Sequence, residues 1–498
     1  MLPRTLHPIA APLAAALLAG CGTFSHYPTG VNQVVLGPMD RGEDLRPATA
    51  ELVSRIQGRD EVLFASEAGR TAQLYGDYAA SRDAFDKAIA RTAAQGDEAV
   101  FAARVAAQQA SAVLVNDKAI EYRAPAYEQA LVHHYQALNY LGSRDLDGAG
   151  VEIRRANRVQ EEALRQHDAE VAKAASRNDS SASDPLADAP SETRTAVSKA
   201  YAGLDELAGQ AKNSFLNAAV FFLSAVVWEM RGEANDAYID YKRALELAPS
   251  TPALQTSAIR LAKRLGMRED LADLSRRFPD AASTPAAGTE AYAGKAHLVV
   301  MVEEGHVAQK ADLYIPFPVS GGLGAINIPV YGKCPSPAGR ITLHVPGAPD
   351  APLAPLCRIS SLAARALSER MPGILARQIA RAVAKSAALG AAGNIDGGHY
   401  HGHGHDQHSG GADAAVLLLS LYNVASEQAD LRSWLTLPDT IQAAEAWPDA
   451  SSGTATASLR WAGGGGIDLP VTLAPGKTTL LYVTRADWAF YSHAFVQP

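Results

Sequence analysis

The sequence predicts an α+β protein, with an N-terminal α-helical repeat domain followed by a mixed domain of β-strands with a few helices. Two observations support this fold class. Between residues 61 and 278, helical hairpins recur with small and aromatic residues at matching positions. In residues 295–498, short apolar runs are broken by Gly and Pro, as in β-strands. A loose Ala- and Pro-rich stretch, residues 279–294, is the expected linker between the two domains.

Three segments carry the helical repeat. The first lies in "GRTAQLYGDYAASRDAFDKAIA" and the second in "ALNYLGSRDLDGAGVEIRRA", where Ala156 follows Ala88 by 68 residues, or two 34-residue periods. The third is "FFLSAVVWEMRGEANDAYIDYKRALELAP", which Pro249 closes. The pattern resembles the second half of a tetratricopeptide unit, in which small residues let two helices touch and an aromatic ring fills the gap. The residues in register are Gly69, Gly76, Tyr78, Phe85 and Ala88, then Tyr140, Ala149, Ile153 and Ala156, then Phe221, Ala225, Trp228, Gly232, Ala237, Tyr241 and Ala244.

A polar stretch interrupts this array. "AASRNDSSASDPLADAPSETR" is rich in Ser, Asp, Ala and Pro and has too few apolar residues to form a core. We expect a flexible insert at about residues 168–195. Because Ala244 lies 88 residues beyond Ala156, the 34-residue phase is also lost here, so a plain superhelix is not expected.

The first twenty residues have the pattern of an export signal. Arg4 precedes "IAAPLAAALLAG", which is shorter than the ~20 residues that span a bilayer. The run ends in Leu18, Ala19, Gly20 and Cys21, which resembles a bacterial lipobox. We expect a lipoprotein signal peptide at residues 1–20, lipidation of Cys21 and a lead segment at residues 21–60. The alternative is an ordinary secretory signal with a chance cysteine.

The residue after Cys21 bears on the membrane. An Asp at this place is the usual inner-membrane retention signal of Gram-negative lipoproteins, and here the residue is Gly22. We therefore expect a protein anchored by its N-terminal lipid to the outer membrane, on the periplasmic face. Burial of the acyl chains at ~0.8 kcal/mol per CH₂ makes such an anchor durable without a spanning helix.

The charge balance limits the partners. The chain has 45 Lys and Arg against 53 Asp and Glu, a net charge of −8. A nucleic-acid partner is not expected, because it would require a basic surface. Beside Cys21 only Cys334 and Cys357 are present, and in an oxidising compartment they form a possible disulfide. Two buried free thiols are the alternative.

The C-terminal half alternates between strands and one long helix. "HLVVMVEEG", "ADLYIPFPV", "INIPVYG", "RITLHVPG" and "ASLRWAGGGGIDLPVTLAPGKTTLLYVTR" predict strands, with "AGGGGID" as a hairpin turn. The segment "SSLAARALSERMPGILARQIARAVAKSAA" predicts a helix. Its apolar face carries Leu375, Ile379 and Val383, and its basic face carries Arg377, Arg381 and Lys385. The basic face is either solvated or a dock for anionic lipid or an acidic partner.

A histidine- and glycine-rich loop, residues 393–412, contains "GGHYHGHGHDQHSGG". Its candidate metal ligands are His399, His401, His403, His405 and His408, because imidazole suits Zn, Cu or Ni. No Cys accompanies them, and ordering a glycine-rich loop costs ~1–2 kcal/mol per residue. We expect a solvated loop with incidental Zn, Cu or Ni affinity and no resident cofactor. Metal capture or protonation sensing is the alternative.

The segment "SEQADLRSWLTLPDTIQAA" brings charged residues beside an indole. Glu427, Asp430, Arg432 and Trp434 could form a charged constellation. The structural interpretation is an Asp430–Arg432 pair that fixes a turn, Trp434 as a core anchor and Asp439 at a helix start. The chain has no H-E-x-x-H, G-x-S-x-G or Walker sequence, so no catalytic residue is assigned.

Four segments carry a family resemblance over most of the chain after residue 20. They are "VLVNDKAIEYRAPAYEQALVHHYQALNYL", "NSFLNAAVFFLSAVVWEMRGEANDAYIDYKRALELAP", "RQIARAVAKSAA" and "SEQADLRSWLTLP". They resemble a family of uncharacterised bacterial outer-membrane lipoproteins with tetratricopeptide-like repeats. Relatives tend to have "NPF" where this chain has Asn217, Ala218 and Ala219. The resemblance implies a lipoprotein without established catalytic residues, with a possible link to peptidoglycan synthesis through neighbouring genes.

These observations favour a non-catalytic cell-envelope lipoprotein that acts as a protein–protein interaction scaffold, because helical repeats offer concave surfaces to envelope protein partners. An envelope enzyme acting on wall or lipid and a metal-binding lipoprotein are the alternatives. An enzyme should gather titratable side chains in one closed pocket of the C-terminal domain, whereas a scaffold should have an open groove.

Overall fold

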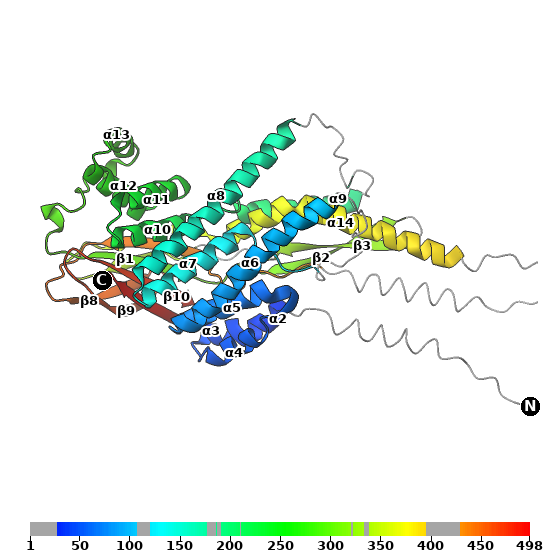
Figure 1. The fold of residues 1–498 in the computed structure, drawn as a ribbon, viewed down its shortest axis with the longest axis horizontal. Helices are drawn as coiled ribbons and strands as arrows, with labels where there is room; N and C mark the ends of the chain where they lie inside the picture. The colour runs from blue at the N-terminus through cyan, green and yellow to red at the C-terminus, as the bar shows by residue number, and fades with distance from the viewer. Residues whose placement is uncertain are drawn as a thin grey trace, which may run out of the picture.

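A computed structural model describes residues 27–106, 120–176, 186, 191–209, 211–319, 322–332, 338–394 and 429–498. Within these residues the predicted α+β fold class is confirmed, with most helices before residue 295 and the strands after it (Figure 1). Among the described residues, none of the helices combines the length and the hydropathy needed to cross a bilayer.

Antiparallel helical hairpins form the first half of the fold. They are α5 (Glu61–Leu74) with α6 (Tyr78–Ala106), α7 (Ala126–Gly142) with α8 (Leu146–Ser176), α10 (Ala218–Met230) with α11 (Ala234–Leu247), and α12 (Pro252–Leu265) with α13 (Arg268–Arg277). The small residues of the pattern have the expected place. A Cβ atom on Gly69 would lie 2.7 Å from the Phe85 ring, so only glycine lets α6 approach α5 this closely.

The segment before the hairpins also folds. Residues 27–60 form α2 (Tyr27–Val31), η2 (Asn32–Leu36), α3 (Gly37–Arg41), α4 (Arg46–Ser54) and η3 (Gly58–Asp60). Val35, Met39 and Leu45 are almost fully buried in the main core. This part of the expected lead segment is therefore an integral layer of the fold, because its apolar residues are covered by the same core as the hairpins.

The strands form two sheets and a separate ribbon. In the five-stranded sheet, β1 (His297–Glu304) lies parallel to β10 (Thr478–Ala486) and antiparallel to β7 (Thr440–Ala446), with β11 (Ala489–Val496) and β6 (Ala354–Arg358) at the edges. The four-stranded sheet has the order β5 (Ala351–Pro352), β4 (Ile341–His344), β8 (Thr454–Trp461) and β9 (Gly466–Thr472). The turn between β8 and β9 is the predicted glycine hairpin, in which Gly464 and Gly465 have positive φ angles.

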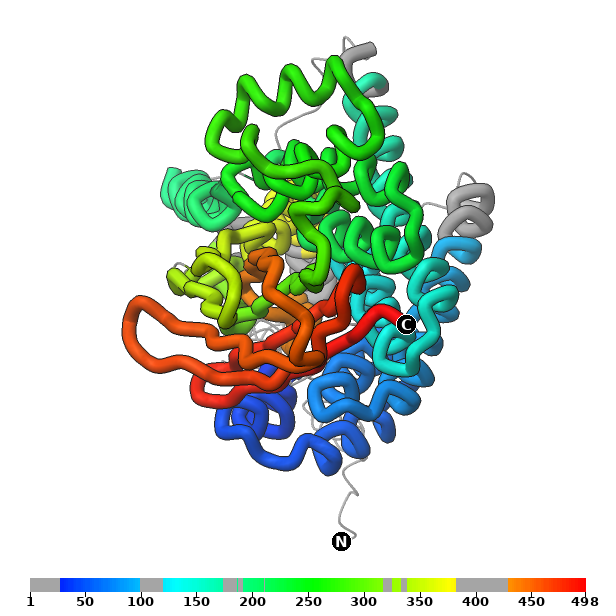
Figure 2. The backbone as a smooth tube through the Cα atoms, turned by 90° about the vertical axis from the view of Figure 1, so that its left-hand side faces the viewer, coloured from blue at the N-terminus to red at the C-terminus, as the bar shows by residue number. Residues whose placement is uncertain are grey.

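Successive side chains of β1 point to opposite faces of the five-stranded sheet. One face packs on the helices and the other on the four-stranded sheet. Val299 and Met301 pack into the core shared with the helices. Leu298, Val300 and Val302 pack into a second core against the four-stranded sheet. Figure 2 shows the orange and red strands with the blue and cyan helices along one side. The inner side of the helical array is therefore filled by the sheet.

This shared core corrects the predicted division into two domains. The expected linker, residues 279–294, contains the short helices η5 (Pro279–Ala281) and η6 (Glu290–Tyr292). Ala281 is buried, and Ala287 donates its backbone N–H to the carbonyl oxygen of Arg260 on α12. The composition of this stretch predicted a loose connection, but its backbone groups are used in packing against α12.

A second difference concerns the polar insert. Helix α8 continues to Ser176 and α9 (Ser191–Ala208) begins before the predicted end at residue 195. Helix α9 does not extend the hairpin array. It packs on α14 (Ile359–Asn394) and on the ribbon of β2 (Lys310–Val319) and β3 (Gly322–Tyr331), with which it forms a separate small core.

Helix α14 is the helix predicted after residue 359, and its apolar face packs as expected. Leu375 is buried and Ile379 packs beside it on the ribbon core. The prediction of a fully solvated basic face is wrong, because Arg381 is only 3% exposed. Arg377 instead lines a cleft, described next, and the side chains of Val383 and Lys385 lie outside the described residues.

Candidate functional site

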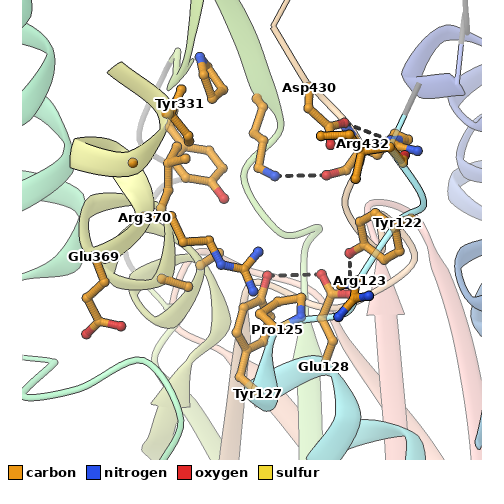
Figure 3. A pocket seen from close by; sticks show the side chains of 18 of the residues that line it. Tyr122, Arg123, Pro125, Tyr127, Glu128, Tyr331, Glu369, Arg370, Asp430 and Arg432 are labelled. Carbon is orange, nitrogen blue, oxygen red and sulfur yellow. Dashed lines mark hydrogen bonds and ion pairs between the residues drawn. The ribbon is translucent and has the colours of Figure 1, made fainter. Parts of the chain in front are cut away.

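A cleft in the described part of the chain has a volume of about 550 Å³. It opens where the start of α7, helix α14, the β2–β3 ribbon and the segment around residue 430 meet (Figure 3). This volume lies within the ~300–1,000 Å³ typical of ligand pockets. The cleft is therefore the candidate functional site.

The start of α7 supplies the floor of the cleft. Pro125 precedes the first turn of α7, and Glu128 lies in that turn. The carboxylate of Glu128 accepts hydrogen bonds from the hydroxyl of Tyr122 at 2.5 Å, from the hydroxyl of Tyr127 at 3.1 Å and from the backbone N–H of Trp434 at 3.3 Å. Burial raises the pKa of Glu128, although these donors oppose the rise. Three protein donors thus engage this buried carboxylate.

The segment from Asp430 to Trp434 forms one wall. Asp430 and Arg432 form an ion pair of 2.8 Å, and a second nitrogen of Arg432 lies 2.6 Å from Asp60. Burial alone would raise the pKa of Asp430, but the hydrogen bonds and charge of Arg432 outweigh it and keep this pKa low. Trp434 is 1% exposed and packs edge-on against Phe85. The turn-fixing pair and the core anchor of the sequence analysis are both present in this geometry.

A second buried carboxylate holds the same segment from behind. Glu67 of α5 accepts the backbone N–H groups of Leu435 at 2.7 Å and Thr436 at 3.1 Å. It also accepts the hydroxyl of Tyr27 at 2.5 Å. Burial raises the pKa of Glu67 to about 7 despite these donors. Two helices of the array therefore hold residues 434–436 through side-chain carboxylates.

Lys310, at the start of β2, faces the cleft from the ribbon side. Its Nζ donates to the backbone carbonyl oxygen of Arg432 at 2.8 Å. Burial lowers the pKa of Lys310, and the charges of Asp430 and Glu128 oppose this effect. Lys310 and Tyr331 are paired across the β2–β3 ribbon, so both residues line the cleft from the ribbon side.

The acidic side chains of the cleft are all engaged by protein donors. Besides Glu128 and Asp430, Glu121 accepts from the Arg91 guanidinium at 2.6 Å and Glu369 accepts from the Ser214 hydroxyl at 2.6 Å. No other Asp or Glu is found among its described lining residues. A carboxylate that already accepts hydrogen bonds from the protein is less well placed to take a proton from a substrate.

Two basic side chains of the cleft, in contrast, have no hydrogen-bond or ion-pair partner among the described residues. Arg123 and Arg370 both line the cleft and are exposed to solvent there. Within the described residues neither guanidinium has a hydrogen-bond acceptor or an ion-pair partner. Figure 3 shows Arg370 extending from α14 toward the middle of the cleft. The cleft therefore offers two guanidinium groups whose N–H donors are not used by the described residues, which suits an anionic ligand.

Several sequence-predicted residues lie outside the described part of the chain. These are the lipidation residue Cys21, one cysteine of the predicted disulfide, Cys334, the charged residue Glu427, and the candidate metal ligands His399, His401, His403, His405 and His408. Cys357 lies on β6 and has no disulfide partner among the described residues. Burial raises the pKa of its thiol. The pairing of Cys357 with Cys334 stays a prediction.

One predicted role involves a helix from a distant segment. Asp439 precedes strand β7 and does not start a helix of its own segment, but its carboxylate accepts hydrogen bonds from the hydroxyl and the backbone N–H of Ser360 at the start of α14. The same carboxylate forms an ion pair of 3.0 Å with Arg358. Among the described residues, no group of three or more His, Cys, Asp and Glu is placed to hold a metal ion.

The sequence analysis missed most of the cleft. Arg123, Glu128, Lys310, Tyr331 and Arg370 were not singled out. A signal was available for the first two, because "EYRAPAYE" places aromatic and charged residues around a Pro just before a helix. Nothing in the sequence indicates that α14 and the ribbon would meet this segment.

The fold and the cleft together define a class, an α+β protein with a helix-covered β-sandwich and an arginine-lined cleft at the end of the helical array. Comparison with known proteins finds no matching family model, no matching curated protein and no matching solved structure.

Proposed function

We propose that this protein is a non-catalytic binding protein of the cell envelope, anchored by a lipid on Cys21 to the periplasmic face of the outer membrane, which binds an anionic group of its partner in the cleft. The anchor and the compartment rest on the lipobox-like sequence that ends at Cys21. The binding role rests on the cleft. The observation that carries it is that Arg123 and Arg370 are unpartnered among the described residues, whereas every acidic lining residue is engaged.

The cleft takes the role of the binding surface that a scaffold of helical repeats ordinarily has on the inner side of its array. Such repeats bind partners on the inner side of the array. Here that side packs on β1 and β10 through residues such as Tyr135 and Tyr482, which are buried in one core. A partner therefore has no access to the inner side, and the cleft at the end of the array is the best remaining place for recognition.

Catalysis receives less support from the same geometry. An enzyme acting on wall or lipid needs a free general acid or base near the substrate. The candidate would be Glu128, but its carboxylate already accepts three hydrogen bonds from the protein.

The proposal is tested by photocrosslinking in intact envelopes. A benzoylphenylalanine at Ile374, which lines the cleft, should give a light-dependent adduct visible in the intact mass of the protein. The matched control is the same replacement at Ile239, which is 49% exposed on α11 away from the cleft. The Arg123→Gln and Arg370→Gln changes together should abolish the adduct at Ile374. Adducts that form only at Ile239, or that ignore both arginines, would overturn the proposal.

A further inference from the structure

Both cationic and apolar side chains line the cleft, and a small anion rarely contacts both kinds. The cationic groups are the guanidinium groups of Arg123 and of Arg370 on α14 and the ammonium group of Lys310. Helix α14 also lines the cleft with the apolar residues Ala363, Ala366, Leu367 and Ile374, beside the charged residues Glu369 and Arg377. A ligand that contacts both kinds of side chain is itself amphipathic, with an anionic head and a short apolar continuation.

The position of the cleft relative to the N-terminus adds an independent constraint. Tyr27 begins the described chain, and its hydroxyl donates a hydrogen bond to Glu67. Glu67 also accepts the backbone N–H of Leu435. The residue before Leu435 donates its own backbone N–H to the cleft residue Glu128. The side-chain amides of Asn32 and Gln309 form two hydrogen bonds with each other, at 2.9 and 2.7 Å. Gln309 directly precedes the cleft residue Lys310 in the chain. Figure 1 shows α2 near the start of the β2–β3 ribbon. The chain therefore enters the folded part beside the cleft.

The length of chain before Tyr27 sets the distance to the membrane. Cys21 precedes Tyr27 by six residues. Six residues span at most ~20 Å when fully extended, at ~3.3–3.6 Å per residue. If the sulfur of Cys21 carries the lipid, this end of the molecule is held within about 20 Å of the bilayer surface. The ligands at highest local concentration around the cleft are then lipid headgroups.

We infer that the cleft binds the phosphate group of an anionic membrane lipid, with Arg123 and Arg370 as the phosphate ligands and the apolar side chains of α14 against the glycerol and first acyl carbons. This inference rests on the proposed function and names its ligand. Guanidinium groups match phosphate oxygens with paired N–H donors, and the Tyr331 hydroxyl and Lys310 are further donors at the same cleft. An acidic protein segment would contact the cationic side chains of the cleft but not the apolar side chains of α14.

The test uses the full chain with Cys21→Ser, so that binding does not depend on the anchor. The probes are dihexanoyl phosphatidylglycerol, dihexanoylglycerol without phosphate, inorganic phosphate, and a glutamate-rich peptide. Binding is measured by native mass spectrometry and by titration at constant salt. We expect phosphatidylglycerol to bind more tightly than every other probe. The Arg123→Gln, Arg370→Gln double variant should bind it at least about tenfold more weakly, a loss of ~1.4 kcal/mol.

The Arg276→Gln, Arg277→Gln double variant is the matched control, because both arginines are exposed on α13 and their replacement removes two positive charges outside the cleft. It should leave the affinity within about twofold, as expected for a screened surface charge. The cleft arginines make no hydrogen bond within the described residues, so their variants should melt like the parent. Melting curves verify this before affinities are compared.

The other outcomes separate the two proposals. Inorganic phosphate that binds as tightly as the lipid would overturn the lipid source. A glutamate-rich peptide that binds while the lipid does not would overturn this inference and leave the proposed function standing. If no probe binds and the crosslinker at Ile374 also captures nothing, both proposals fail.

Discussion

Arg70 of helix α5 and Glu303 of strand β1 form an ion pair in which neither side chain is more than 2% exposed. Glu303 also accepts the hydroxyls of Thr484 at 2.6 Å, Tyr135 at 2.7 Å and Tyr482 at 2.8 Å. The two residues are 233 positions apart in the chain. The pair therefore ties the helical layer to the centre of the five-stranded sheet.

Removal of Arg70 should strongly destabilise the fold. In Arg70→Met, Glu303 remains buried without its cation, and breaking a buried pair from one side costs about 3–5 kcal/mol. Urea unfolding of the Cys21→Ser chain measures this loss. The Arg70→Met, Glu303→Leu double variant should lose less than Arg70→Met alone, because no buried charge remains. A loss below about 1 kcal/mol for Arg70→Met would contradict this role of the pair.

Glu67 predicts a pH dependence of stability. Its pKa is raised from 4.5 to about 7 in the folded state. Between these values the folded protein holds a proton that the unfolded chain has released, so the contribution of Glu67 is largest at low pH. It is lost as the pH rises to about 7.

The measurement is the free energy of unfolding of the parent minus that of Glu67→Gln. This difference should shrink by about 2–3 kcal/mol from pH 5 to pH 8. Glu51→Gln, a change at an exposed partner of Arg55, should show no such trend. A difference that stays constant would show that the pKa of Glu67 is unshifted, and one that grows with pH would show that it is lowered; either result would contradict the prediction.

Cys21→Ser tests the lipid anchor. The described helices include none suited to span a bilayer, and the anchor is expected from the lipobox-like sequence. The variant should move from the membrane fraction to the soluble periplasmic fraction, because a thioether to lipid can no longer form. Fractionation with an immunoblot checks this. Tight membrane association of the variant, retained in high salt, would refute lipid anchoring at this residue.

Deletion of residues 397–411 tests the histidine-rich loop. If the loop is solvated, its removal should change the free energy of unfolding by no more than about 0.5 kcal/mol. A folded metal site would behave differently, because zinc or copper at 100 times its dissociation constant adds about 2.7 kcal/mol to the folded state. We expect no metal-dependent rise in melting temperature at micromolar metal. A rise that the deletion abolishes would make metal binding the favoured function of this protein.

The amphipathic elements were the predictable part of the fold. The Gly69–Phe85 contact and the glycine turn at Gly464 follow from local rules, because a helix or a hairpin requires particular residues at fixed spacing. The Asp430–Arg432 pair was also within reach of the sequence, since its members are two residues apart.

The candidate site was mostly beyond such rules. Glu128 and Trp434 are 306 positions apart, and Glu67 and Leu435 are 368 apart. A sequence pattern reports which face of an element is apolar, but it does not report which element that face will meet. The arginines of the cleft look like ordinary surface charges until α14 is placed opposite the start of α7.

The sequence by itself determined the α+β class, the hairpins and the strands, because periodicity and turn chemistry act within a few residues. Only the tertiary structure decided that the sheet fills the inner side of the helical array and that one core joins both halves. It also decided which charges are neutralised. Arg70 and Arg432 are buried in ion pairs, whereas Arg370 faces an open cleft, and that difference depends on the desolvation and partners that only long-range packing supplies.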